Sequence, residues 1–276
     1  MIIDSHQHFW IYNPVEYDWI DEDMKKIRRD FLPDDLKPVI NSTGVDGVIT
    51  VQARQTIEET DWILKHASNN DFIKGVVGWF PLTDLHVEDY LEKYKDHPML
   101  KGLRHVLQGE PDQEYMLRAD FNRGIRLLNK YDLVYEILIF ERHLPITIEF
   151  VDTHPDQVFI LDHIGKPIIK NNVIEPWKKN IFELAKRDNV FCKISGMVTE
   201  ADYRNWTVKQ LYPYLDTVLE AFGADRLIFG SDWPVCLVAC EYRQWFNIVK
   251  DFISRLNDTE QDGILGLNAQ RIYKLN

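Results

Sequence analysis

Eight short apolar runs recur along the 276-residue chain, and most of them are followed by a longer segment with helical periodicity. Each run is nearly continuous in Val, Ile, Leu and Phe, which is typical of parallel strands that are covered on both faces. We therefore predict strands near residues 2–6, 47–52, 73–78, 101–106, 134–140, 158–163, 190–195 and 226–231.

The segments between these runs carry helix start signals and apolar residues near helical spacing. Thr56-Ile57-Glu58-Glu59 fits a capping box that opens a helix ending near residue 69. Further helices are predicted at 84–97, 120–131, 142–154, 176–188, 207–222, 241–256 and 258–274.

Eight strands that alternate with helices predict an α/β protein built as a (β/α)8 TIM barrel, with residues 1–276 forming a single domain. Such barrels are typically about 250 residues long. A doubly wound open sheet is the competing arrangement, but it normally carries a Gly-x-Gly-x-x-Gly turn after its first strand. That motif is absent here, so the barrel is the prediction.

One connection is long and has little periodicity. Between residues 9 and 32 the aromatic residues Trp10, Tyr12, Tyr17 and Trp19 lie among acidic residues. A loop of this length in a compact domain is usually functional, and in a barrel it would lie at the mouth that holds the active site. It either covers the pocket as a lid or packs over the barrel end as an aromatic cluster.

The formal net charge is −12, and the acidic residues are spread without any basic block. This distribution disfavours nucleic acid or an anionic membrane surface as a partner. No apolar run has the length of a membrane span, and the first residues lack the features of a signal peptide, so we expect a cytoplasmic protein. The cysteines form no Cys-x-x-Cys pair and are expected to be buried apolar residues: Cys192, Cys236 and Cys240.

Polar residues gather at the ends of the predicted strands, where a barrel has its active site. His6 and His8 end the first run, and alternate residues of a strand face the same side, as neighbouring metal ligands would. His105 has the opposite parity to Arg104, so we expect only one of them to face the pocket. Four other histidines are expected at the surface: His66, His86, His97 and His154.

The order of these motifs resembles the amidohydrolase superfamily, and within it the branch that includes sugar lactonases and pyrone dicarboxylate lactonases. L-fuconolactone- and L-rhamnonolactone-type enzymes are the most similar members of this branch. The resemblance spans nearly the whole chain and rests on residues 4–10, 51–53, 101–105, 161–163, 192–196 and 229–234.

The resemblance implies one divalent metal ion, zinc or manganese, held by His6, His8, His163 and Asp232. It also implies that Asp232 is the general base beside His163, and that Arg104 and Lys193 polarise the carbonyl or hold hydroxyl groups. The seventh strand offers Lys193 instead of a further histidine, which argues against a binuclear site. A metal-free mechanism is the alternative. The residues expected to bind substrate are Trp10, Gln52, Arg54, His105 and Trp233.

A lactone is an ester, so an activated water and one carbonyl polariser suffice to open it. No Gly-x-Ser-x-Gly elbow is present, which argues against a serine hydrolase. We therefore expect a lactonase whose partner is a small sugar lactone, and a homo-oligomer is compatible with the sequence. The alternatives are a pyrone dicarboxylate lactonase, a metal-dependent decarboxylase of a small carboxylic acid, and an inactive barrel that serves as a binding scaffold.

Overall fold

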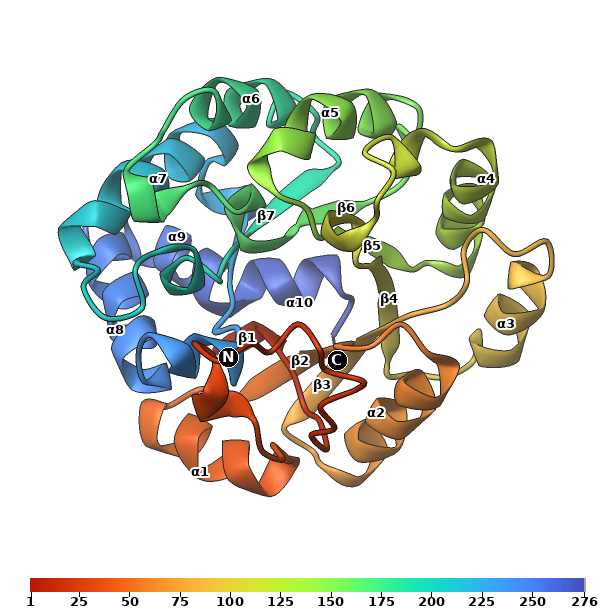
Figure 1. The fold of residues 1–276 in the computed structure, drawn as a ribbon, viewed down its shortest axis with the longest axis horizontal. Helices are drawn as coiled ribbons and strands as arrows, with labels where there is room; N and C mark the ends of the chain where they lie inside the picture. The colour runs from red at the N-terminus through yellow and green to blue at the C-terminus, as the bar shows by residue number, and fades with distance from the viewer. Residues whose placement is uncertain (276) are drawn as a thin grey trace.

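The computed structural model describes residues 1–275, and eight parallel strands form its centre (Figure 1). Each strand pairs with the next in chain order, and a parallel bridge between Gln7 and Trp233 joins the first strand to the segment after the last. This arrangement confirms the predicted TIM barrel. The strands are β1 Ile3–Gln7, β2 Gly47–Val51, β3 Ile73–Gly78, β4 Leu100–His105, β5 Val134–Ile137, β6 Phe159–Leu161, β7 Val190–Ile194 and β8 Leu227–Phe229.

Helices surround the strands as a ring, and each of the first eight follows its strand (Figure 1). They are α1 Pro33–Thr43, α2 Ile57–Asn69, α3 Val87–Tyr94, α4 Ala119–Leu128, α5 Leu144–Asp152, α6 Trp177–Leu184, α7 Val208–Phe222 and α8 Tyr242–Ile253. The sequence analysis did not predict α1, which contains Pro38 in its interior. Across residues 1–275, the helices all fall short of the length and apolar character that crossing a membrane requires.

The C-terminal segment was predicted as one helix, but it consists of three parts. These are α9 Asp258–Asp262, a π-helix over Gly263–Leu267 and α10 Asn268–Ile272. In Figure 1, α10 lies across the middle of the ring of helices. Its buried residues pack with apolar residues of six strands in one cluster that closes the barrel: Ile3, Ile49, Val51, Val77, Val134, Ile160, Ile228, Ala269, Ile272 and Tyr273.

A bulge in β1 determines which of its side chains face the barrel interior. Between Asp4 and Gln7 the register shifts, so three steps along β1 oppose two steps along β2. Ile3 can therefore lie in the apolar cluster that closes the barrel, while His6, an odd number of residues later, also faces inward. A regular strand would place these two side chains on opposite faces.

The long loop between residues 9 and 32 closes on itself. Trp10 and Phe31 exchange two backbone hydrogen bonds of 2.9 Å. The Trp10 indole donates to the Arg29 carbonyl, and its ring contacts the rings of Tyr17, Trp19 and Phe31. Trp10 is fully buried, so the loop packs as an aromatic cluster, and its action as a lid stays a prediction.

Candidate active site

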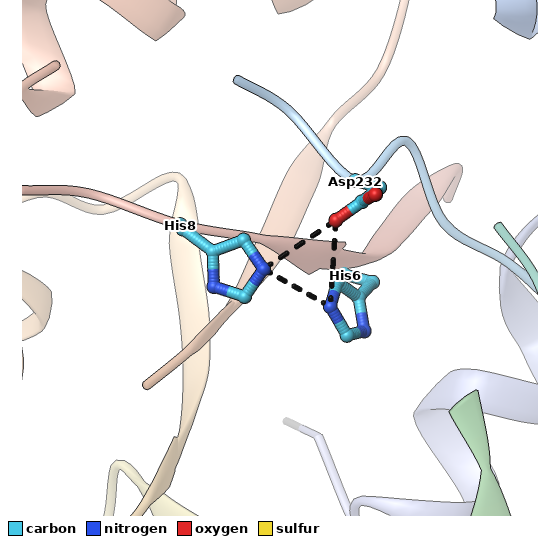
Figure 2. Close-up of side chains that lie close together, drawn as sticks. All are labelled: His6, His8 and Asp232. Carbon is cyan, nitrogen blue, oxygen red and sulfur yellow. Dashed lines mark hydrogen bonds and ion pairs between the residues drawn. The ribbon is translucent and has the colours of Figure 1, made fainter. Parts of the chain in front are cut away.

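Three imidazoles point their Nε2 atoms at one carboxylate oxygen at the C-terminal end of the barrel. The Nε2 atoms of His8, His6 and His163 lie 3.5, 3.9 and 4.0 Å from Oδ1 of Asp232. His6 and His8 are 3.2 Å apart between their Nε2 atoms. Figure 2 shows these two rings turned toward each other and toward the carboxylate of Asp232. The structure thus brings together the four residues that the resemblance implies as metal ligands.

Neighbouring groups fix two of these rings with Nε2 toward the centre. The Nδ1 atom of His8 lies 2.8 Å from the Val51 carbonyl, which can only accept a hydrogen bond, so Nδ1 carries the hydrogen and the Nε2 lone pair is free. The Nδ1 atom of His163 lies 2.8 Å from the Ser195 hydroxyl, and this contact holds the orientation of the ring. All four side chains at the centre are buried.

The donor set fits a divalent metal such as Zn²⁺. Imidazole nitrogens and one carboxylate are usual zinc ligands, and ligand atoms of a tetrahedral zinc site lie about 3.3 Å from one another. The distance between the Nε2 atoms of His6 and His8 is 3.2 Å, and the three Nε2 atoms lie 3.5 to 4.0 Å from Asp232, close to that value. Imidazole lone pairs that face one another also favour a cation between them.

Two of the four residues have an unusual backbone conformation. His163 and Asp232 have φ values of 52° and 57°, in the left-handed region that residues with a side chain rarely adopt. Each such residue costs roughly 1–2 kcal/mol, and strained residues of this kind cluster at functional sites. The left-handed backbone at His163 also explains why β6 ends at Leu161, two residues before the predicted end.

A layer of fully buried charged side chains lies directly beneath the three imidazoles. The Lys193 ammonium lies 2.5 Å from Glu136, 3.2 Å from Asp162 and 3.1 Å from the Nδ1 atom of His6. From below, the Tyr273 hydroxyl donates to Glu136. Lys193 is fully buried and its charge is balanced by these two carboxylates, so its ammonium belongs to the charged layer beneath His6. This placement favours a supporting role, and the expectation that Lys193 polarises the substrate stays a prediction.

Arg104 occupies the same layer. Its Nη1 donates to Asp162 at 3.0 Å and lies 3.3 Å from the Nε2 atom of His6. Its Nη2 donates to the carbonyl and side-chain oxygens of Gln52. Arg104 is thus held against the metal-ligand centre, while the amide of Gln52 is occupied by this contact and is buried rather than offered to a substrate.

The charges of this site act on each other's pKa values. Burial lowers the pKa of His163 to about 4 and that of His6 well below its ordinary value, although Asp232 and Asp162 oppose these shifts. Burial alone would raise the pKa of Asp232, but His163 and His8 more than offset it, so the pKa is lowered. Near neutral pH, two of the imidazoles are therefore neutral and the carboxylate is ionised, as metal ligands must be.

Three residues expected to bind substrate lie away from the four-residue centre, and their contact with a substrate stays a prediction. Trp10 and Trp233 are buried in the aromatic cluster beneath the long loop, where Trp233 contacts Phe9 and Phe31. His105 points away from the barrel interior, since it accepts from the Trp79 indole and pairs with Glu110 at 2.6 Å. Of the predicted pair, Arg104 is thus the residue that faces the centre.

Arg54 is the predicted substrate residue that does reach the rim. Its side chain is 24% exposed and lies 2.5 Å from Glu16 in the long loop. Glu59 fixes the segment that carries it, because one oxygen of its carboxylate accepts the backbone N–H groups of Ala53 and Arg54 at 3.0 and 2.7 Å. Only one half of the expected capping box is present: the Thr56 hydroxyl accepts from the Glu59 N–H, but the Glu59 carboxylate bonds to the segment before the helix.

Some residues of the charged layer were not predicted, and one histidine was misplaced. Asp162 and Glu136 were not among the residues expected at the site. A charged residue at an inward position of an otherwise apolar strand is the signal that identifies them. Tyr273 has no such signal, because its role depends on how α10 closes the barrel. His154 was expected at the surface but is buried and bonded to Asn122.

The barrel and its His6, His8, His163 and Asp232 centre define a hydrolase of the amidohydrolase type. The chain belongs to the amidohydrolase family, whose model matches residues 3–275. It is 39% identical to an L-fucono-1,5-lactonase of Burkholderia multivorans, over 99% of this chain and 96% of that protein. It is 33% identical to an L-fucono-1,5-lactonase of Burkholderia ambifaria, over 99% of this chain and 95% of that protein. The fold is similar to the crystal structure of an amidohydrolase from Burkholderia multivorans with bound zinc, with a TM-score of 0.97, 38% identity and complete coverage of both chains.

Proposed function

We propose that the protein hydrolyses a sugar lactone, an aldonolactone of the L-fucono-1,5-lactone kind, to the corresponding aldonic acid. The observation that carries this proposal is the convergence of three imidazole Nε2 atoms on the ionised carboxylate of Asp232. The full-length similarity to two L-fucono-1,5-lactonases supports the choice of substrate. A place in cytoplasmic carbohydrate metabolism belongs to the same proposal.

One divalent metal ion, for which zinc is the first choice, would be held by His6, His8, His163 and Asp232. Such an ion lowers the pKa of water and polarises an ester carbonyl. The similarity to a zinc-bound amidohydrolase and the donor set support zinc. The carboxylate of Asp162 lies 3.4 Å from Nδ1 of His6 and is positioned to accept the hydrogen of that atom, which leaves the lone pair on Nε2 toward the centre.

In the proposed reaction, the carboxylate of Asp232 takes a proton from the attacking water and later gives it to the ring oxygen that leaves. The lowered pKa of Asp232 keeps this carboxylate ionised at neutral pH, which is the form that can accept a proton. The rings of His8 and His163 remain fixed through Val51 and Ser195 during these steps. Arg54 at the rim is positioned to contact hydroxyl or carbonyl oxygens of the substrate.

The experiment that tests this function is a substrate comparison with a pH indicator. Purified protein is incubated with a panel of aldonolactones, a pyrone dicarboxylate and simple aromatic acids. We expect acid release from aldonolactones, with kcat/KM at least about 100-fold above the pyrone dicarboxylate, and no carbon dioxide from the aromatic acids. Turnover of the pyrone dicarboxylate or decarboxylation without aldonolactone hydrolysis would overturn the proposal.

A further inference from the structure

Four consecutive residues after β6 form a left-handed turn. The φ values of His163, Ile164, Gly165 and Lys166 are 52°, 50°, 72° and 46°. This conformation is unfavourable for residues with a side chain, and isolated residues rather than runs normally adopt it. The β-branched Ile164 is especially unsuited to it. Strained residues of this kind persist where the surrounding structure holds them, and they cluster at functional sites.

The turn places Lys166 on the same face as the metal ligand His163. The Lys166 N–H donates to the His163 carbonyl at 2.8 Å, a bond that spans three residues. In a turn of this kind, side chains three apart lie one above the other. The charge of Lys166 accordingly reaches both groups: it adds to the lowering of the His163 pKa by burial, and it helps His163 and His8 to lower the pKa of Asp232 against the effect of burial.

Glu200, in the segment after β7, is the partner of Lys166. Its carboxylate lies 3.4 Å from the Lys166 ammonium, and the two side chains are 20% and 15% exposed. The ammonium also lies over the ring of Phe140, 5.4 Å from its centre. Burial raises the pKa of Glu200, which Lys166 opposes. A donor, an acceptor and an aromatic face therefore lie together beside the catalytic carboxylate, supplied by loops after three different strands.

We propose that Lys166 and Glu200 form a subsite for two neighbouring hydroxyl groups of the sugar ring, with Phe140 beneath the ring carbons. This inference rests on the proposed function. A hydroxyl donates to the carboxylate while its neighbour accepts from the ammonium, so the pair recognises a diol rather than the ester. A site that hydrogen-bonds hydroxyls discriminates strongly against an analogue that lacks them.

The test compares Lys166→Met and Glu200→Gln with the wild type on an aldonolactone and on unsubstituted δ-valerolactone. The measured quantity is the ratio of kcat/KM for the two substrates. We expect each variant to lower this ratio at least about 20-fold, mainly through KM for the aldonolactone, and Lys166→Arg to recover part of it. Lys186→Met, which removes a lysine paired with Glu183 on the outer surface of the barrel, is the matched control and should leave the ratio unchanged.

Calorimetric binding of the two ring-opened acids, the aldonate and 5-hydroxypentanoate, provides a second measurement that does not depend on turnover. We expect Lys166→Met to weaken binding of the aldonate far more than that of 5-hydroxypentanoate. An unchanged ratio, or an equal loss for both substrates and both acids, would overturn the subsite. Failure of the proposed function is a different result, since the wild type itself would then hydrolyse no aldonolactone.

Discussion

Replacing Asp232 with asparagine is expected to lower kcat for aldonolactone hydrolysis by about 1,000-fold or more. The amide keeps the size of the carboxylate but carries no charge and cannot take a proton from water. General acid–base catalysis by one side chain contributes about 10²- to 10⁴-fold, and this variant also loses the anionic member of the metal-ligand set. Turnover is measured by acid release at saturating substrate.

The fold of the Asp232→Asn variant should remain intact, because the replacement is close to isosteric. Circular dichroism and thermal unfolding check this point, and Asp188→Asn, at an exposed position, is the matched control with unchanged turnover. Activity of the Asp232→Asn variant within 10-fold of the wild type would contradict the role of Asp232 as the base.

The Lys193→Met variant is expected to lose about 3–5 kcal/mol of unfolding free energy. Lys193 lies between the carboxylates of Glu136 and Asp162, all three side chains are fully buried, and removal of one partner leaves uncompensated charge in the interior. Urea unfolding measures the loss. Lys186→Met removes an exposed ion pair and should cost less than about 1 kcal/mol.

The cost of Lys193→Met should increase as the pH rises. Burial already raises the pKa of Glu136 to about 7 in the presence of Lys193, which opposes that shift, so its removal raises the pKa further. When the pKa of a carboxyl group is higher in the folded than in the unfolded state, the protein loses unfolding free energy as the pH rises from the unfolded-state pKa to the folded-state pKa. Unfolding at pH 5.5 and pH 8 should therefore give the larger loss at pH 8.

A double variant separates the charge effect from the loss of packing. Lys193→Met with Glu136→Gln removes one buried cation and one buried anion, so it should be more stable than Lys193→Met alone at pH 8. Two results would contradict this role of the buried charge layer. One is a loss of less than about 1 kcal/mol of unfolding free energy in Lys193→Met. The other is a double variant whose loss equals the sum of the losses of the two single variants.

The barrel was predictable from the sequence because parallel strands covered on both faces are visible as apolar runs. His6 and His8 were predictable as neighbours from their spacing, and Asp232 and His163 from their place after strands. The bulge in β1 was not predictable, because it depends on register against β2 rather than on any local signal. Helix α1 was missed because Pro38 interrupts the helical pattern.

The substrate-facing residues were harder to predict than the ligands. Trp10 and Trp233 follow His8 and Asp232 closely in the chain, yet their large apolar surfaces pack beneath the long loop. Sequence distance from a ligand does not show which way a side chain turns once the strand has ended. Lys166 was not expected at the site. It reaches the site because four successive residues, including Lys166, have a left-handed backbone.

Chelation followed by zinc restoration tests most directly whether the three imidazoles and Asp232 hold a metal that activates water. The account predicts that chelator-treated protein contains less than about 0.1 zinc per chain, loses aldonolactone hydrolysis, and recovers it after one equivalent of zinc. Elemental analysis and acid release are measured on the same samples. Full turnover in protein shown to be free of zinc and manganese would contradict the account.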